Sequence, residues 1–480
     1  MKNTKQNKKP AKFVKREIKK EANEPLPEGA ALNKSLPAGK GGKKIYQALR
    51  GMHDVLPKDE KYWAALYHTA EKLASYYQFA RVETPILEEA SLFIRSVGKG
   101  TDIVDKEMYI FEDRDGTRVA LRPEPTAGIV RSYIQHGLWN APQPVKVWTS
   151  GPIFRHDRPQ AGRYRQFYQF DFETIGAKDP AMDVELILVA YSIFKDLGIS
   201  TEVRINSIGD REERARYVAE LTNYYRGKRA YLCDDCKNRL SKNPLRLLDC
   251  KVEGCQPIKE TAPQIIDWLG ESSKNYFMKV LEYLDELSIP YLLDHTLVRG
   301  LDYYTHTVFE IYESAREADP SAASLTGAQS ALAGGGRYDL LAEELGGQSA
   351  PAVGFGLGIE RAVTVLKALE EKKPGSIPGV VYDVFFAQLG EEAKRRSLKI
   401  LNELRFSGIR PAFNLFRGSL KAQLETANSL KVPYVLILGQ KEVQDKTIII
   451  RDMESGVQEI VDQKKLEAAI KKKLIDRLPK

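Results

Sequence analysis

The stretch Gly151–Gly176 reads GPIFRHDRPQAGRYRQFYQFDFETIG, and it is the part of the sequence that decides the fold. Apolar and aromatic residues alternate with polar ones on both sides of a charged centre, which predicts two half-buried strands. The connector Pro159–Gly162 consists largely of turn-forming residues and predicts a long hairpin loop. Arginines on such antiparallel strands project toward a common point, where their planar charged groups suit a polyphosphate. The alternative is a surface hairpin with solvated arginines.

Composition places the chain among globular proteins of two or three domains. Its 480 residues are 42% hydrophobic and 29% charged, which is ordinary for such a protein. No apolar run approaches the length of a membrane span, and the lysine-rich N-terminus lacks the apolar core of a secretory signal. We therefore expect a cytoplasmic protein without a membrane partner.

The net charge of +8 is distributed unevenly along the chain. Residues 1–44 contain 13 lysines and arginines against four glutamates, and residues 381–480 contain 19 basic against 13 acidic residues. Basic ends are compatible with a polyanionic partner. Because residues 1–44 contain little apolar material, we predict a disordered tail, which is either an RNA-binding arm or inert.

Two segments before the hairpin predict further parts of a site. The region 59–85 has the pattern of an amphipathic helix and then a strand that ends at Pro85. The segment 121–128 reads LRPEPTAG at the end of an expected strand, where charged side chains suit the rim of a site. Glu124 is placed there to receive an ammonium group. Thr126 either belongs to the same site or is a plain N-cap of the next helix.

All four cysteines lie in a charged helical segment at about 210–270, which we interpret as an insertion into the sheet. Their arrangement is Cys233-x2-Cys236-x13-Cys250-x4-Cys255, which is typical of a structural tetrathiolate zinc site. The last spacing is loose and no histidine lies close by, so free buried thiols are the alternative. Disulfides are rare in the cytoplasm, and no partner base marks a catalytic cysteine.

The segment 297–310, LVRGLDYYTHTVFE, predicts a strand, a turn around Arg299 and Gly300, and a second strand. Buried arginine and tyrosine side chains are costly unless they bind something. The hydroxyl groups of Tyr303 and Tyr304 suit an imidazole ring, which both donates and accepts hydrogen bonds.

Two glycine-rich stretches follow. The segment 329–339, QSALAGGGRYD, predicts a strand whose glycines let a ligand approach the backbone just before Tyr338. The segment 352–363, AVGFGLGIERAV, predicts a strand that runs into a helix. Arg361 at this junction is placed to lie over an adenine ring or to reach a phosphate.

These motifs occur in the order that is found in one enzyme family. F-R-H-D, a loop and G-R-Y-R-Q-F resemble motif 2 of the class II aminoacyl-tRNA synthetases, and the strands at Pro85 and at 352–363 resemble motifs 1 and 3. R-G-L-D-Y-Y-T and GGGRY resemble the two histidine signatures of the histidyl-tRNA synthetase family, in its bacterial form. The alternating strands and helices of 381–480 resemble the anticodon-binding domain of class II enzymes.

The resemblance implies an α+β fold that is organised as follows: 1–44 a disordered basic tail, 45–369 a class II antiparallel-sheet catalytic core with the helical insertion, 370–380 a linker, and 381–480 an α/β anticodon-binding domain. It implies a homodimer that ligates L-histidine to tRNA(His). Histidine would attack ATP to give histidyl-adenylate, with Mg²⁺ bridging the outer phosphates, and would then be transferred to the 3′ end of the tRNA.

The resemblance also implies residue roles. Arg155 and Arg299 would be catalytic by holding the α-phosphate, and ATP would be bound by Arg155, Arg163 and Arg361. Arg158 and Gln160 of the motif 2 loop would contact an extra 5′ guanosine of the tRNA.

Ten residues would bind histidine, and they divide between its amino group and its ring. Glu124, Thr126 and Gln169 would meet the amino group, whereas Glu173 and Tyr304 would meet the imidazole. The full set is Glu124, Pro125, Thr126, Arg155, Gln169, Glu173, Arg299, Tyr303, Tyr304 and Tyr338.

A catalytically silent relative, such as a regulatory subunit of histidine biosynthesis, is the main alternative. Such a protein would be expected to lack the C-terminal domain and to have a degraded R-G-L-D-Y-Y or motif 2. The sequence here has the C-terminal domain and both motifs intact. A synthetase for proline or threonine is argued against by Glu173 and the Tyr303-Tyr304 pair. The six histidines show no paired ligand spacing, which argues against a metalloenzyme.

Overall fold

The computed structural model describes residues 46–98, 100–157, 163–314, 331–377, 379, 381–416 and 419–477. The elements below lie in one unit, Leu49–Lys480. The predicted tail at 1–44 and the predicted tRNA contacts Arg158 and Gln160 lie outside the described residues. Within the described part, no helix has the length and apolar character that a membrane crossing requires.

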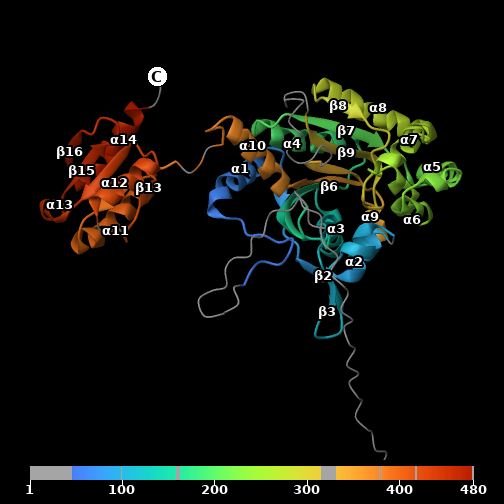
Figure 1. The fold of residues 1–480 in the computed structure, drawn as a ribbon, viewed down its shortest axis with the longest axis horizontal. Coiled ribbons are helices and arrows are strands. Elements are labelled where there is room, and N and C mark those ends of the chain that lie inside the picture. Colours follow the sequence, from blue (N-terminus) through green and yellow to red (C-terminus); the bar gives the residue numbers. More distant parts are fainter. Residues whose placement is uncertain are drawn as a thin grey trace, which may run out of the picture. The chain divides into compact units, whose positions relative to one another are not determined.

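An eight-stranded sheet forms the centre of the larger part of the chain, in the order β1-β5-β6-β11-β10-β9-β7-β8 (Figure 1). Neighbouring strands are antiparallel except for the edge pairs β1–β5 and β7–β8. The α+β fold predicted from the sequence is therefore confirmed. The strands are β1 (Ala80–Arg81), β5 (Val145–Phe154), β6 (Gln166–Ile175), β7 (Thr201–Ser207), β8 (Tyr291–Leu293), β9 (Thr305–Glu313), β10 (Ala333–Arg337) and β11 (Ala352–Gly358).

Strands β5 and β6 are the hairpin predicted from the opening motif, paired from Val145–Ile175 to Phe154–Gln166. Because side chains alternate along a strand, β6 presents a different chemistry on each face. Phe170 and Phe172 are fully buried in an apolar cluster on one face. The polar residues between and beside them face the opposite way and carry the site described below.

Four helices cover the apolar face of the large sheet: α1 (Glu60–Tyr76), α4 (Pro180–Asp196), α8 (Glu271–Glu286) and α10 (Ile359–Lys372). Helix α4 begins where its sequence predicts, because Asp179 accepts a 2.8 Å bond from the Ala181 N–H and Pro180 takes the first helical position. Its apolar residues Leu186, Ile187 and Phe194 are fully buried against the sheet.

The other face of the sheet is covered by α3 (Thr126–Gln135), α9 (Leu341–Glu344) and the helices of the insertion, which are α5 (Arg211–Arg226), α6 (Asp234–Lys242) and α7 (Gln256–Glu260). Helix α5 begins with a capping box in which Asp210 and Glu213 each accept from the other's backbone. A short turn, η5 (Pro244–Leu247), links α6 to the second pair of cysteines.

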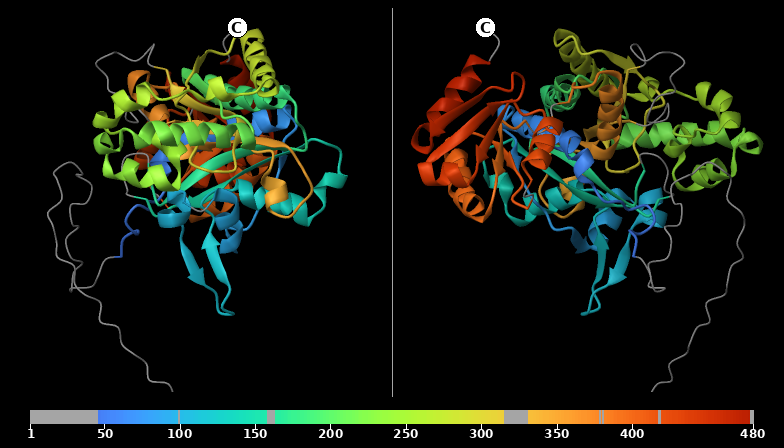
Figure 2. Two further views of the ribbon diagram at one scale, coloured as in Figure 1. Left: turned by 90° about the vertical axis from the view of Figure 1, so that its right-hand side faces the viewer. Right: turned by 60° about the vertical axis from the view of Figure 1, so that its left-hand side comes forward.

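A smaller sheet has the strand order β2 (Leu87–Glu89), β4 (Arg118–Leu121) and β3 (Ile110–Glu112), and helix α2 (Ala90–Val97) lies between its first two strands along the chain. Figure 2 shows its β3–β4 hairpin, drawn in cyan, projecting away from the large sheet. Strand β4 ends at Leu121, so that the chain turns from it into α3 at Glu124 and Thr126.

Of the two strands predicted around Arg299 and Gly300, the second is present as the start of β9, but the first is wrong. The described chain from 294 to 304 contains turns and no strand, and it connects β8 to β9. Both of these strands pair with β7, one on each side of it. A hairpin between them is impossible because β7 lies between, so the connection passes over the end of β7 as a loop.

The C-terminal part is an α/β domain with the sheet order β13-β12-β14-β15-β16. Strands β13, β12 and β14 pair in parallel, whereas β15 pairs antiparallel with both β14 and β16. Its elements are β12 (Val384–Gln388), α11 (Glu391–Phe406), β13 (Pro411–Phe413), α12 (Leu420–Ser429), β14 (Tyr434–Leu438), α13 (Gln440–Asp445), β15 (Thr447–Asp452), β16 (Gln458–Asp462) and α14 (Leu466–Asp476). The sequence analysis missed α13 and β16, which are short and mostly polar.

Candidate active site

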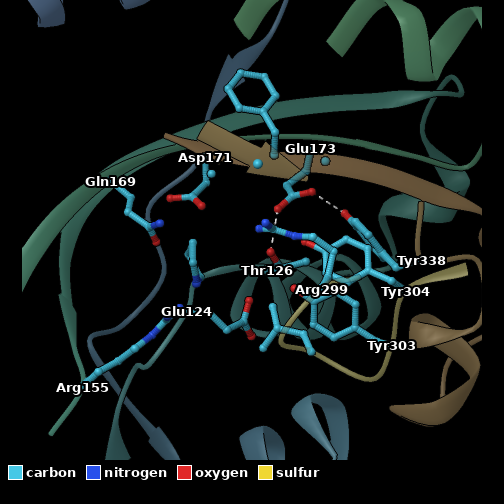
Figure 3. A pocket seen from close by; sticks show the side chains of 16 residues that line it. Glu124, Thr126, Arg155, Gln169, Asp171, Glu173, Arg299, Tyr303, Tyr304 and Tyr338 are labelled. Atoms are coloured by element: carbon cyan, nitrogen blue, oxygen red, sulfur yellow. Dashed lines mark hydrogen bonds between the residues drawn. The ribbon is translucent and has the colours of Figure 1, made fainter. Parts of the chain in front are cut away.

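A pocket of about 400 Å³, counted together with the open solvent at its mouth, lies on the polar face of the large sheet. All ten residues predicted to bind histidine line it (Figure 3). Six further residues line it that the sequence analysis did not assign: Asp171, Leu301, Gly334, Gly354, Phe355 and Gly356.

Glu173 on β6 is held by two hydroxyl groups. Thr126 donates to Oε1 at 2.8 Å, and Tyr338 donates to Oε2 at 2.5 Å (Figure 3). Complete burial raises the pKa of this carboxyl well above its usual range, although both hydroxyl donors lower it. Each oxygen retains a lone pair, so the group can still accept a bond from a ligand in the pocket.

Glu124 and Thr126 occupy the turn into α3. Glu124 Oε1 accepts from the Ala127 N–H at 3.0 Å, whereas its Oε2 is buried and makes no hydrogen bond in the described part of the chain. The alternative role of Thr126 as a plain N-cap is wrong, because Pro125 is the cap residue and the Thr126 hydroxyl bonds Glu173. Burial raises the pKa of the Glu124 carboxyl. An unpaired buried acceptor of this kind suits a cationic ligand group.

Asp171 lies between Gln169 and Glu173 on the same face of β6. It is only 4% exposed, and the charges of Arg122 and Arg155 act on its carboxyl. Burial raises the pKa of this carboxyl well above its usual range, and the nearby Glu124 raises it further. The alternation of polar residues along β6 was the signal that would have identified Asp171 from the sequence.

The positive side of the pocket comes from Arg155 and Arg299. Arg155 follows β5, and its Nε donates to the Pro123 carbonyl at 2.8 Å. Arg299 forms an ion pair with Glu310, and its Nε is buried without a partner in the described chain. Burial alone would lower the pKa of Arg299, but the contact with Glu310 raises it, so the guanidinium stays charged.

Three tyrosines form one wall of the pocket. The rings of Tyr303 and Tyr304 have their centroids 4.7 Å apart, and Tyr338 lies 5.6 Å from Tyr303 with its ring at 66°. All three are at most 5% exposed. A wall of aromatic rings with hydroxyl groups can enclose a planar polar ring.

Glycines form the floor of the pocket on β10 and β11. A Cβ at Gly354 would lie 1.4 Å from Oε2 of Glu173, and a Cβ at Gly334 would lie 2.5 Å from Nη1 of Arg299. Any larger residue at Gly354 or Gly334 would therefore displace the side chain of Glu173 or Arg299. This explains the glycine-rich sequence in structural terms.

Arg163 and Arg361, which were predicted to bind ATP, are not among the pocket-lining residues. Burial lowers the pKa of Arg361, and the charges of Arg163 and Arg155 lower it further. Arg361 donates to the Ala331 carbonyl at 2.7 Å, and Arg163 pairs with Asp157 at 3.1 Å. Repelling cations held together in this way suit a polyanion.

The four cysteines come together although the first and the last lie 22 positions apart in the chain. Their sulfur atoms all lie within 4.8 Å of one another, and Cys233 and Cys250 are 3.9 Å apart. Cys236, Cys250 and Cys255 are buried. Tetrahedral thiolates around zinc, at bonds of about 2.3 Å, lie about 3.8 Å apart, so the arrangement fits such an ion.

The antiparallel sheet, the arginines beside the pocket and the C-terminal α/β domain together define a class II aminoacyl-tRNA synthetase. The histidyl-tRNA synthetase family model matches residues 51–209 and 259–362, and the model of an anticodon binding domain matches residues 383–473. The chain belongs to the histidyl-tRNA synthetase family.

Individual relatives agree with this assignment. A histidine–tRNA ligase of Natranaerobius thermophilus is 45% identical over 429 residues, which cover 89% of this chain and 99% of that protein. One of Aquifex aeolicus is 44% identical over 86% of this chain and 97% of its own length. The crystal structure of apo S. aureus histidyl-tRNA synthetase covers 89% of this chain and all of its own, with a TM-score of 0.70 and 35% identity.

Proposed function

We propose that the chain activates L-histidine with ATP and transfers it to tRNA(His). The observation that supports this most directly is Glu173, a buried carboxylate that two hydroxyl groups orient beside a tyrosine wall. In the first step the histidine carboxylate attacks the α-phosphate and pyrophosphate leaves. In the second step the ribose hydroxyl at the 3′ end of the tRNA attacks the adenylate carbonyl and AMP leaves.

The acidic end of the pocket would receive the α-ammonium group of histidine. Such a group has three N–H donors, and three acceptors lie at this end: Glu124 Oε2, Asp171 and the amide oxygen of Gln169. We add Asp171 to the residues expected from the family resemblance, because it is a buried carboxyl group in the pocket whose ionised form an incoming cation would stabilise. Thr126 would act indirectly, because its hydroxyl group donates to Glu173 and fixes the position of that carboxylate.

The imidazole would lie against the tyrosine wall between Glu173 and Tyr304. A carboxylate that faces one ring nitrogen and a hydroxyl that faces the other would select histidine, because another ring would leave buried polar groups unpaired. Tyr303 and Tyr338 would enclose the ring, and Pro125 would line the pocket beside it.

Arg155 and Arg299 would hold the α-phosphate and stabilise the charge that develops on it. Arg361 and Arg163, close to Arg155, would serve the rest of ATP. No general base is needed for the first step, because the histidine carboxylate is already ionised. ATP would enter as its magnesium complex, so the metal is part of the substrate.

The tRNA would be read at two places, and the chain would act as a homodimer. The C-terminal domain would bind the anticodon, as the matched family model indicates. Arg158 and Gln160 would contact the extra 5′ guanosine of tRNA(His). A Gln160→Ala variant should then lose part of its preference for tRNA that carries this guanosine, and an unchanged preference would remove the proposal. Light scattering of the protein tests the dimer.

The four cysteines would hold a structural zinc ion. The sulfur positions fit a tetrathiolate, and a bound ion would cross-link the two cysteine pairs within the insertion. Metal analysis should then find about one zinc per chain, and Cys250→Ser should lose it. Four freely titrating thiols in metal-free protein as purified would favour the alternative of free buried thiols.

ATP–pyrophosphate exchange, with each of the twenty amino acids offered separately and no tRNA present, tests the proposed function. Exchange with histidine alone is expected. Exchange with another amino acid would overturn the assignment of Glu173 and the tyrosines, and no exchange from folded protein would favour the silent relative.

A further inference from the structure

The segment between the two cysteine pairs contacts the loop that carries the pocket tyrosines. Asn243, which follows α6, donates from Nδ2 to Asp302 Oδ1 at 2.8 Å. The guanidinium of Arg246 in η5 lies against the backbone of Gly300, so closely that a Cβ on Gly300 would be 2.9 Å from Nη1. These two contacts fall between Arg299 and Tyr303.

Arg246 is itself held in place from two sides. Its Nη2 lies 3.2 Å from Asp249 and 3.9 Å from Asp102 of the catalytic core. Arg239 of α6 donates to the Arg246 carbonyl at 3.4 Å and also reaches Asp102 at 3.4 Å. Asp102 therefore joins the insertion to the core at the point where Arg246 meets the loop.

The loop is fixed from its other side as well. Arg214 of α5 donates to the carbonyls of Asp302 and Tyr304, and the Asp302 N–H donates to the Val97 carbonyl at 3.1 Å. Asp302 is exposed and does not line the pocket. Its contacts therefore bear on the position of the loop and not on a ligand.

The cysteine site and the tyrosine wall also share one apolar cluster. Cys236, Cys250 and Cys255 belong to the same buried cluster as Tyr303 and Tyr304. Helix α6 has nine residues and η5 has four, and elements of that length are marginal without tertiary support. A cross-link at both ends of this segment would supply the support.

We propose that the cysteine site is a clamp for histidine binding: a metal ion held by the four cysteines fixes residues 237–249, and through Asn243 and Arg246 positions Arg299, Tyr303 and Tyr304. The inference rests on the proposed zinc site and on the proposed histidine pocket. Residues 210–258 lie outside the stretches that the catalytic family model matches, so the clamp is a feature of the insertion.

Substitutions that leave the cysteines intact test the positioning role. Arg246→Ala should raise the KM for histidine in ATP–pyrophosphate exchange by about fivefold or more and leave the KM for ATP within about twofold. Asn243→Ala should act in the same direction but more weakly, because its bond is exposed to solvent. Arg226→Ala and Asn238→Ala, at exposed positions of the insertion, are the controls and should change neither constant.

A swapped pair separates this contact from a general loss of stability. In the double variant Asn243→Asp with Asp302→Asn, the hydrogen bond can form in the reverse direction. The KM for histidine of this double variant should therefore lie closer to the wild-type value than that of Asn243→Ala. Hydrogen exchange of a peptide that spans residues 297–305 should be faster in Arg246→Ala than in the wild type. Unchanged KM and unchanged exchange in Arg246→Ala would overturn the proposal.

Removal of the metal tests the other half of the clamp. Chelator-treated protein and Cys250→Ser should both show faster exchange in residues 297–305 and a raised KM for histidine. If the purified protein contains no metal while Arg246→Ala has its expected effect, the zinc site fails and the contacts stand. If zinc is present and its removal leaves the loop unchanged, the clamp fails.

A wild type without histidine-dependent pyrophosphate exchange would overturn the proposed function, and the hydrogen-exchange results would still decide the loop contacts.

Discussion

Tyr338 donates a hydrogen bond of 2.5 Å to Oε2 of Glu173, and this bond joins the residue after β10 to the C-terminal part of β6. Strand β11 lies between these two strands, and the hydrogen bond passes over it at Gly354. A side chain at Gly354 would occupy the position of the Glu173 carboxylate. The carboxylate is thus oriented before any ligand enters, and an oriented acceptor costs less to use in binding than a mobile one.

Glu173→Gln should lower kcat/KM for histidine by about 100-fold, because an amide accepts fewer bonds than a carboxylate and the bond to the imidazole loses its charge. The KM for ATP should change by less than about twofold. Pyrophosphate exchange at varied histidine and ATP measures both. Glu220→Gln, at an exposed position, is the matched control. Equal losses for the two substrates would contradict the role of Glu173.

Asp171→Asn should weaken histidine binding by about tenfold, since the ammonium group loses a charged acceptor. The amine-free analogue 3-(imidazol-4-yl)propionate should bind wild type and variant equally well. Calorimetric titration of both ligands measures the difference, with Asp115→Asn in the exposed β3–β4 turn as the control. A similar loss for both ligands would indicate that Asp171 acts through packing alone.

Gly354→Ala should abolish most histidine activation while the protein stays folded, because the added methyl group would displace the Glu173 carboxylate. We expect a loss of more than about 100-fold in kcat/KM for histidine. Gly227→Ala is the control, since its added Cβ would meet only the Tyr224 carbonyl at 3.7 Å. Circular dichroism and pyrophosphate exchange together make the test, and near-normal activity of Gly354→Ala would contradict the described floor of the pocket.

Glu360 should make stability fall as pH rises through neutrality. Burial raises the pKa of its carboxyl to about 7, although both oxygens accept from the Tyr168 N–H at 3.0 Å, which favours the ionised form. A carboxyl whose pKa is higher in the folded than in the unfolded state stabilises the fold below its unfolded pKa, and that contribution is lost as pH rises through the folded value.

The difference between Glu360→Gln and wild type isolates this effect. Between pH 5 and pH 8 the urea midpoint of the wild type should fall relative to that of the variant, because the amide does not titrate. A difference between the two proteins that stays constant with pH would show that Glu360 ionises without cost in the fold.

Much of the fold was predictable because local patterns decide it. The hairpin of β5 and β6, the helices α1 and α4 and the alternating elements of the C-terminal domain all follow from periodicity. The loop at 294–304 was not predictable in the same way, because its apolar residues do not pack in a strand. They contact the insertion and the tyrosine wall, and such long-range contacts have no local signal.

The pocket shows the same division. The ten residues that motif resemblance named all line one pocket, whereas Asp171 was missed because it belongs to no motif. The hydroxyl of Thr126 was assigned to an amino group or to a cap, yet it bonds Glu173, 47 positions away. Which partner a side chain chooses depends on elements that meet only in the folded chain.

Strand β6 gives one face to the apolar cluster, through Phe170 and Phe172, and the other to Gln169, Asp171 and Glu173 in the pocket. Inserting or deleting a single residue would turn each group toward the opposite side. Such a change would remove the proposed substrate contacts and the packing together. Along this strand, selectivity for a different amino acid can therefore arise only by exchange of side chains at constant length, with every exchange constrained by the aromatic layer behind it.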